Sequence, residues 1–337
     1  MQSRTFLPPI EADAVHIDTV KLTHSYLASD LPLPTDLAKL GFDLNFKQRG
    51  GNDITTAHPK QHITISSEPY ITVIRSSNNH SYSGITVECS LMKLVKYNGL
   101  GEQNEVDIDC SLDAIEDAVR NRVNVNFDAR TAKVSRFDVN ADFNVGEQRI
   151  KLYMDSLSRP YSRLTPSKFD DSTVYYYNGS RTFAVYGKRK EMEKQLKKRK
   201  VMKHDVDAAE GLMRVEMRLK TPDAVKRYAK KIPVNAVAKD LCTQTIASKL
   251  ISETINQLDL DRTKISMDAR ADLLIQEFGI SAPEMLGILK YKELLGEDFW
   301  KKIGWSASTY YRKKKELEAV NLWNVSPDEA LPALVIP

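Results

Sequence analysis

The sequence predicts an α+β protein in which an antiparallel-sheet domain is followed by a smaller helical region. From about residue 15 to residue 219, short segments alternate between apolar and polar residues, which is the period of half-buried strands. From about residue 222 onward the apolar spacing becomes helical. Between two aromatic-rich segments, Asn178-Gly179 is the strongest hairpin signal in the chain. We therefore expect a sheet domain over residues 1–221, a helical region over 222–325 and a loosely held tail over 326–337.

The alternating segments predict the strands of the first domain, and one longer segment predicts a helix. The expected strands are residues 16–22, 62–66, 71–75, 84–89, 132–144, 173–177, 182–186 and 211–219, with a helix at 111–121. Beyond residue 222, helices are expected at 223–230, 234–257, 267–278, 282–295 and 308–319.

Composition is that of a globular protein with room for one large domain or two ordinary ones. The chain has 337 residues, of which 42% are hydrophobic and 28% charged. No apolar run approaches the roughly 20 residues that span a bilayer, and the N-terminus lacks the pattern of a signal peptide. Three widely spaced cysteines form no CxxC pair. A cytoplasmic protein with free thiols and no membrane partner is expected.

The net charge is only +4, but the basic residues are concentrated in clusters along the chain. The densest cluster spans residues 188–203, and smaller ones lie at 220–231 and 312–315. Clustered cations suit a polyphosphate partner, because each one that neutralises a phosphate releases counterions. A solvated helix face is the plainer interpretation. The candidate nucleic-acid contacts in the first and last clusters are Arg189, Lys190, Lys197, Lys198, Arg199, Arg312 and Lys313.

Two expected strands each carry one apolar and one charged face. In residues 135–143 alternation places Arg136 and Asp138 on the polar face, and in 211–219 it places Arg214, Glu216 and Arg218 together. If the strands share a sheet, Asp138 and Glu216 can face each other. Two carboxylates flanked by arginines suit a hard cation holding a phosphate, and the alternative is an exposed strand with cross-strand ion pairs.

Tyr186 ends the second strand of the expected hairpin, directly before the basic cluster that begins at Lys188. A phenol has a pKa near ~10, so it attacks phosphorus well only where cations or a metal favour the phenolate. The alternative is an aromatic ring packed at a strand end, as expected for the tyrosines at 175–177. The histidines remain unassigned, since Pro59 argues against a helix that would align His58 with His62; His62 is the best placed of the six.

Near the C-terminus, residues 305–317 read as a turn, a cap at Ser308 and a basic helix. With the preceding helix this segment could form a helix-turn-helix whose second helix lies against DNA. An ordinary lysine-rich surface helix is the alternative.

Five stretches in order resemble the gene II and X family of phage and plasmid replication proteins. They are residues 16–22 (HIDTVKL), 86–95 (TVECS to KLV), 135–138 (SRFD), 172–188 (STV to FAVYGK) and 211–218 (GLMRVEMR). The resemblance covers roughly the first 220 residues. The chain beyond Lys220 matches loosely, and no motif supplies a histidine ligand.

The resemblance implies a site-specific, metal-dependent nickase that initiates rolling-circle DNA replication. Such proteins keep the 5′ phosphate as a phosphotyrosine, free a 3′ hydroxyl for the host polymerase and later rejoin the displaced strand. Carried over by position, the nucleophile is Tyr186 and the acidic sheet positions are Asp138 and Glu216, with Mg²⁺ or Mn²⁺ as the metal. Lys188 and Arg214 are then the cations that offset transition-state charge, and Arg136 and Arg218 contact DNA. A host helicase is a further implied partner.

Two other functions stay open at this point. One is an origin-binding or regulatory protein that has lost cleavage, although Tyr186, Asp138 and Glu216 are all present. The other is a tyrosine recombinase, which would need a largely helical catalytic domain and no metal.

Overall fold

The computed structural model describes twelve stretches of the chain, which form two compact units. The described residues are 9–49, 52–59, 68–76, 82–96, 100–157, 165–170, 172–261, 274–275, 277–295, 298–319, 323 and 331–337. The larger unit comprises residues 11–258 with 336–337, and the smaller comprises 1–10 with 259–335. No helix in these stretches is long and apolar enough to cross a membrane.

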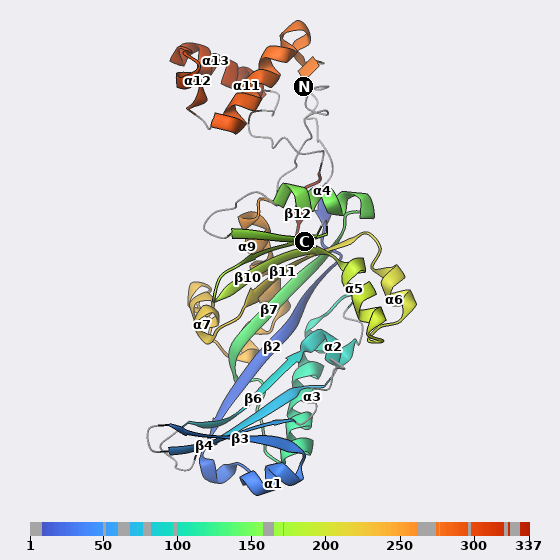
Figure 1. The fold of residues 1–337 in the computed structure, drawn as a ribbon, viewed down its shortest axis with the longest axis vertical. Coiled ribbons are helices and arrows are strands. Elements are labelled where there is room, and N and C mark those ends of the chain that lie inside the picture. Colours follow the sequence, from blue (N-terminus) through green and yellow to red (C-terminus); the bar gives the residue numbers. More distant parts are fainter. Residues whose placement is uncertain are drawn as a thin grey trace. The chain divides into compact units, whose positions relative to one another are not determined.

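The larger unit is built on a ten-stranded antiparallel sheet (Figure 1). Its order is β3-β4-β5-β6-β2-β7-β11-β10-β9-β8. The strands are β2 Ala14–Tyr26, β3 Phe42–Arg49, β4 Asn52–Pro59, β5 Tyr70–Ser76, β6 Ser83–Ser90, β7 Lys133–Asn144, β8 Thr165–Asp170, β9 Thr173–Tyr177, β10 Arg181–Gly187 and β11 Leu212–Leu219. Together with the helices this confirms the α+β class and places β2, β7 and β11 at the centre.

Most of the expected strands are present, and those missed lie toward the edges of the sheet. Strands β3, β4 and β8 were not expected: β4 and β8 contain few apolar residues, and the apolar–polar alternation of β3 (FDLNF) was overlooked. A strand at the edge of a sheet needs fewer buried apolar residues than a central strand does. The expected strand at 62–66 lies outside the described residues.

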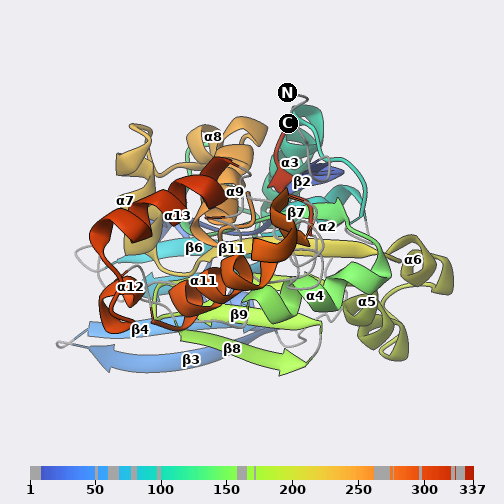
Figure 2. The ribbon, with the colours of Figure 1, turned by 90° about the horizontal axis from the view of Figure 1, so that it is seen from above.

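The apolar face of the central strands forms the core with two helices. Val139 and Phe143 of β7 and Val215 of β11 are fully buried. Helices α7 (Pro222–Lys231) and α9 (Gln244–Gln257) pack on these strands and supply Val225 and Ile251 (Figure 2). Both helices therefore belong to the larger unit, and the functional boundary expected after residue 221 stays a prediction.

Seven more helices lie in the described part of the larger unit. They are α1 Pro34–Lys39, α2 Leu91–Val95, α3 Glu105–Val123, α4 Glu147–Leu157, α5 Lys188–Lys197 and α6 Lys203–Ala208, with the short α8 Ala238–Leu241 before α9. The expected helix at 234–257 is thus two helices, since the Thr243 hydroxyl caps α9 by accepting from the Ile246 N–H at 3.3 Å. Asn104 and Asp107 form a capping box that starts α3 well before the expected residue 111.

The hairpin predicted at Asn178 joins β9 to β10. The Asn178 N–H donates to the Arg181 carbonyl at 2.9 Å. The Asn178 side-chain oxygen accepts from the backbone N–H groups of Ser180 (2.9 Å) and Arg181 (2.8 Å). This side-chain turn sets the register in which Thr173 pairs with Tyr186.

The smaller unit consists mainly of helices where it is described. It contains α11 Ala282–Leu295, α12 Phe299–Lys302 and α13 Ala307–Ala319, packed on a shared aromatic and aliphatic cluster. The short strand β12 (Leu334–Val335) pairs with β1 (Ile10–Glu11). Most of the expected helix at 267–278 lies outside the described residues.

Candidate active site on the polar face of the sheet

The strand register brings the predicted site residues onto one face of the sheet. Arg214 on β11 lies opposite Tyr186 on β10, and Arg218 lies opposite Asp138 on β7. Glu216 lies opposite Asn140. Because side chains two residues apart share a face, all of these project to the side away from the apolar core. Asp138 and Glu216 are therefore diagonal neighbours rather than directly opposed.

Both predicted metal-binding carboxylates are buried and already held by arginines. Asp138 is 1% exposed and accepts from Arg136 Nη2 at 2.6 Å, while the same guanidinium donates to Glu88 at 2.8 Å. Glu216 is 3% exposed and accepts from Arg218 Nε and Nη2 at 2.7 and 2.9 Å. Arg136 and Arg218, predicted as DNA contacts, thus hold the carboxylates in place.

Burial raises the pKa of Asp138 to about 7. The guanidinium of Arg136 opposes this shift, and the negative charge of Glu216 adds to it. Asp138 therefore titrates near neutral pH, where a surface aspartate would be fully ionised.

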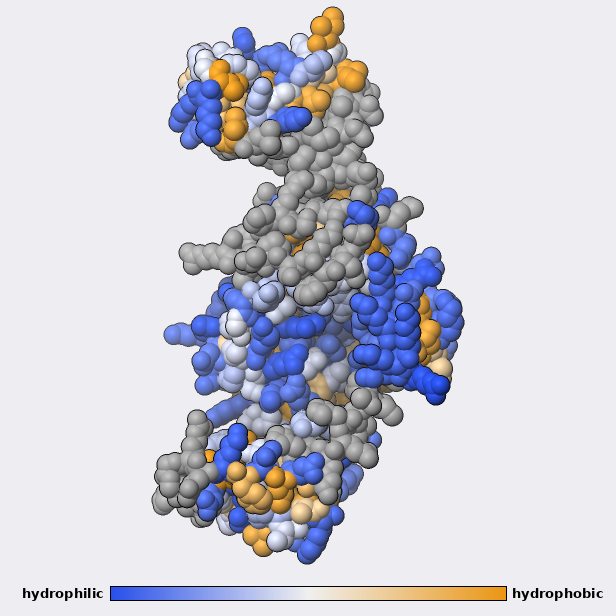
Figure 3. Space-filling model, viewed as in Figure 1, coloured by the Kyte–Doolittle hydropathy of each residue, from blue (hydrophilic) through white to orange (hydrophobic). Residues whose placement is uncertain are grey.

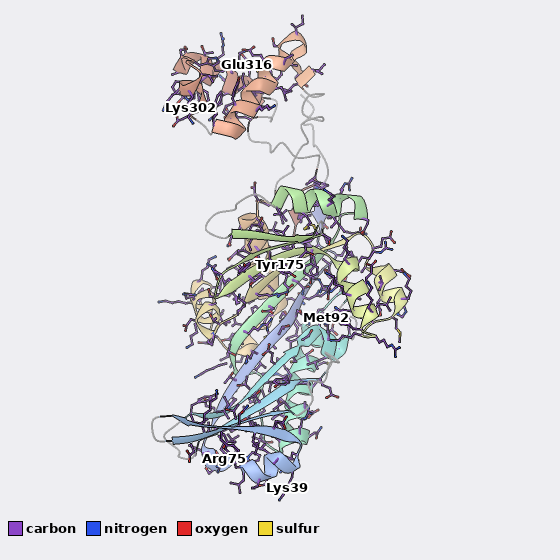
Figure 4. All side chains as sticks on the ribbon, in the orientation of Figure 1. Lys39, Arg75, Met92, Tyr175, Lys302 and Glu316 are labelled. Atoms are coloured by element: carbon purple, nitrogen blue, oxygen red, sulfur yellow. The ribbon has the colours of Figure 1, made fainter. Side chains whose placement is uncertain are left out.

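Tyr186 lines a small polar cavity of about 40 Å³. The cavity is enclosed by His16, Asp18, Met92, Lys93, Asn140, Tyr186, Lys188, Glu191 and Arg214. Figure 4 labels Met92 on α2, which borders the sheet beside β2. Strands β2, β7, β10 and β11 and helices α2 and α5 all contribute to the cavity, so residues distant in sequence meet around one phenol.

The pKa of Tyr186 is raised well above its usual value, first by burial and then by the charge of Glu216. Arg214 opposes the shift but does not overcome it. Lys188, two residues after Tyr186, is only 3% exposed, and its ammonium group donates to Glu191. Burial lowers the pKa of Lys188, and the nearby Arg214 lowers it further. The phenol is therefore protonated in this arrangement and needs a base to become a nucleophile.

Arg214 forms a buried bidentate ion pair with Asp142. Its Nε and Nη2 each donate to an Asp142 oxygen at 2.6 Å, and the two residues are 4% and 3% exposed. Burial alone would raise the pKa of Asp142, but the guanidinium lowers it below its usual value. The pair thus holds the Arg214 guanidinium beside Tyr186, with its charge balanced by Asp142.

Several residues of the cavity were not predicted from the sequence. His16 has its ring nitrogens against the Asn140 side chain (2.9 Å) and the Gly101 carbonyl. Asp18 accepts from the Ser90 hydroxyl at 2.6 Å, and burial of its carboxylate is outweighed by Lys93 together with this hydrogen bond and two further cations, so its pKa is lowered. The signal was the alternation of residues 15–18 (VHID), which places His16 and Asp18 on the face opposite Val15 and Ile17.

A metal-binding set is not preformed among these groups. No cluster of three or more His, Cys, Asp or Glu side chains suited to a metal ion occurs in the described stretches. The oxygens of Asp138 and Glu216 are occupied by guanidinium N–H groups. His62 lies outside the described residues. The carboxylates as arranged do not fit an open Mg²⁺ or Mn²⁺ site, and the metal stays a prediction.

The basic cluster after Tyr186 forms a helical hairpin with its own small core. Met192 of α5 packs with Val206 of α6. Of the predicted DNA contacts, Arg189 pairs with Glu193 and Glu210 (3.6 and 3.3 Å). The other predicted contacts in this cluster are exposed to solvent: Lys190, Lys197, Lys198 and Arg199. In Figure 3 hydrophilic side chains gather over α5 and α6.

An open groove of about 490 Å³ lies on the same sheet face as Tyr186. Thr173 and Thr182 line it together with two rings of β9, Tyr175 and Tyr177 (Figure 4 labels Tyr175). Tyr177 is 55% exposed. The cationic lining residues are Lys194, Arg218 and Lys220. Tyr176, the middle residue of the three tyrosines at 175–177, is buried and packs on the opposite face of the sheet.

The family model of the N-terminal region of the gene II replication-associated protein matches residues 53–237, more than half of the chain. The chain belongs to this family. The matched span includes Asp138, Tyr186 and Glu216, whereas His16 and Asp18 precede it. Membership implies a role in replication initiation, with DNA as the partner. Comparison with curated proteins gives no match.

Proposed function

We propose that the protein initiates rolling-circle replication by nicking one DNA strand at its replicon origin, with Tyr186 as the nucleophile. The observation that carries this proposal is the position of Tyr186, which lines a polar cavity beside the buried Arg214–Asp142 pair. The matched family supports a replication role. A helical recombinase domain is not supported, since Tyr186 lies on β10 of an antiparallel sheet.

The proposed step is a transesterification. The Tyr186 oxygen forms a bond to phosphorus while the bond from phosphorus to the 3′ oxygen breaks, which leaves a 5′-phosphotyrosine and a free 3′ hydroxyl. The phenolic proton passes to a base at the cavity, where His16, Asp18 and Glu191 are the lining groups that can accept it, and the departing 3′ oxygen takes up a proton from that base or from solvent. Arg214 and Lys188 offset the charge that builds on the phosphoryl oxygens. The ester retains the energy of the broken bond, so reversal rejoins the strand without ATP.

Mg²⁺ or Mn²⁺ at Asp138 and Glu216 remains part of the proposal because the resemblance implies it. Binding there requires Arg136 and Arg218 to release the carboxylates that they now hold. A bound cation would polarise a phosphoryl oxygen. The arginine-held carboxylates offer no ready site, so the bond changes above are assigned to the chain's own residues.

The groove beside Tyr186 suits the single strand that a nickase must hold. Exposed aromatic rings stack bases of any sequence, and cations contact the backbone. Tyr177 supplies a ring and Lys220 a cation in one groove on the reactive face. The exposed cations at the end of α5 extend the positive surface. The implied protein partners are a host helicase and the host polymerase that extends the 3′ hydroxyl.

A supercoiled plasmid carrying the cognate origin tests the proposal. With Mg²⁺ present, wild-type protein should yield open circles attached covalently to protein, and peptide mapping should place the nucleotide on Tyr186. Tyr186→Phe should give no adduct, because only the attacking oxygen is removed. Tyr291→Phe is the matched control, since Tyr291 is an exposed tyrosine of α11 in the other unit. Intact plasmid with wild-type protein, or an adduct that persists in Tyr186→Phe, would overturn the assignment.

A further inference from the structure

The smaller unit places a basic helix directly after a tight turn. Helix α12 ends at Lys302, and Gly304 follows with φ of +74°, a conformation that favours glycine. The Trp305 N–H donates to the Trp300 carbonyl at 2.9 Å, which closes the turn. The Ser306 hydroxyl then accepts from the Thr309 N–H at 3.2 Å and caps α13. The cap is thus Ser306 and not Ser308 as expected.

One side of α13 is anchored in the core of the unit. Tyr310 is buried, stacks on Trp300 at 5.4 Å between ring centroids and meets Phe299 edge-on at 5.9 Å. Leu317, two turns later, is fully buried. These contacts fix the rotation of α13 about its axis, so its opposite side is presented to solvent as a rigid surface.

Two of the lysines on α13 turn back toward their own unit. Lys313 is 13% exposed and pairs with Glu284 (3.1 Å) and Glu316 (3.4 Å). Lys314 lies 5.5 Å from the ring centroid of Trp323. Lys313 was predicted as a DNA contact, but in the structure its ammonium group is paired with carboxylates of its own unit. Figure 4 labels Glu316 on this helix.

The solvent-facing stripe of α13 has a different composition. Its exposed members at helical spacing are Ser308, Tyr311, Arg312 and Lys315, followed in the last turn by Ala319 and by Glu318, which pairs with Lys314 at 3.8 Å. Tyr311 is 64% exposed. Within the described stretches neither Arg312 nor Lys315 takes part in an ion pair. Both cations are therefore available to a partner without breaking an internal contact.

We propose that α13 reads duplex DNA in the major groove as the second helix of a helix-turn-helix, with Ser308, Tyr311, Arg312 and Lys315 as the reading stripe. An α-helix fits the major groove, where a guanidinium recognises guanine through its O6 and N7 atoms. Hydroxyl groups and ammonium groups contact phosphates. The inference deepens the proposed function by assigning recognition of the double-stranded origin to this unit, although duplex binding itself does not depend on cleavage.

The test is selection of binding sites from a pool of randomised 30-base-pair duplexes by the full-length chain in EDTA, where binding is read without cleavage. Wild-type protein should enrich a recurrent sequence. Arg312→Ala should lose preference at one position, with a loss of about tenfold to 100-fold for the best duplex. Lys315→Ala should weaken binding to all duplexes and make the salt dependence shallower. Lys290→Ala, which removes an exposed charge from α11, is the control and should behave as wild type.

The outcomes separate this inference from the nickase proposal. No enrichment by wild-type protein, or equal losses in Arg312→Ala and Lys290→Ala, would overturn the reading role of α13. Circular dichroism must show unchanged helix content in each variant, and Arg312→Lys, which keeps the charge but not the planar fork, should still relax specificity. Tyr186→Phe should select the same sequence as wild type, so a failed nicking assay leaves this result intact.

Discussion

Replacing Asp142 by asparagine tests the ion pair beside Tyr186. The substitution keeps the shape of the side chain but removes the carboxylate charge that is hydrogen-bonded to the buried guanidinium of Arg214. Both residues are less than 5% exposed and joined by two bonds of 2.6 Å, so the pair is well shielded from solvent. Removing one partner of such a pair costs about 3–5 kcal/mol. That is a large share of the roughly 5–15 kcal/mol by which a typical domain is stable.

The distribution of tryptophan makes the assay specific to one unit. All three tryptophans, Trp300, Trp305 and Trp323, lie in the smaller unit. Urea unfolding followed by circular dichroism reports on both units, whereas tryptophan fluorescence reports on the smaller one. Asp142→Asn should lower the dichroism midpoint and leave the fluorescence transition in place.

A matched exposed pair provides the control. Asp117 pairs with Arg120 at 2.8 Å, and their side chains are 64% and 55% exposed. Asp117→Asn should cost at most about 1 kcal/mol, because solvent screens the pair. The double variant Asp142→Leu with Arg214→Met should recover most of the lost stability. Equal costs for Asp142→Asn and Asp117→Asn would show that the buried pair contributes no more than a surface pair.

Three further predictions follow from the site and its sheet. Tyr177→Ala should weaken binding of an oligo-dT strand by about 1–3 kcal/mol in fluorescence anisotropy, with Tyr291→Ala as the control; equal losses would exclude the groove. Asp138→Asn and Glu216→Gln should each reduce nicking and raise the Mg²⁺ concentration needed, and wild-type titration curves would refute their role as ligands. The pKa of Tyr26 is raised to about 12 by burial, so its contribution to stability is present below pH ~10 and lost as pH rises toward 12. Tyr26→Phe should flatten that decline in alkaline unfolding curves.

The strands that could be predicted from the sequence are those with one apolar face and one polar face. Apolar and polar residues alternate along β7 and β11, because one face of these strands packs on the core and the other carries the candidate site. Asn178-Gly179 likewise predicted the hairpin that the structure contains. The edge strands were missed because solvent-exposed positions place little demand on apolar spacing. Helices α8 and α9 were predicted as one helix, because neither glycine nor proline marks the break before the Thr243 cap.

The candidate site was predictable in outline but not in its pairings. Alternation places Asp138, Glu216 and Tyr186 on one face, yet it cannot show which arginine holds which carboxylate. Arg214 was predicted as a catalytic cation, and the sequence carries no sign that Asp142 binds it. His16 and Asp18 come from a strand more than 100 residues away from β7 in the chain, and that proximity arises only from sheet order.

Strand β2 departs from regular pairing with β7 between Ile17 and Val20. Both of these side chains are fully buried although three positions separate them, an odd spacing that would send them to opposite faces of an ideal strand. The irregularity lets the first half of β2 direct His16 and Asp18 into the cavity while the second half keeps its own alternation. Over this stretch β2 has one residue more than β7, so deleting Thr19 would restore regular pairing and leave His16, Ile17 and Val20 on their present faces. The sheet would stay folded, but Asp18 would move to the position opposite Asp138, so the extra residue of the bulge is what keeps these two carboxylates out of register with each other.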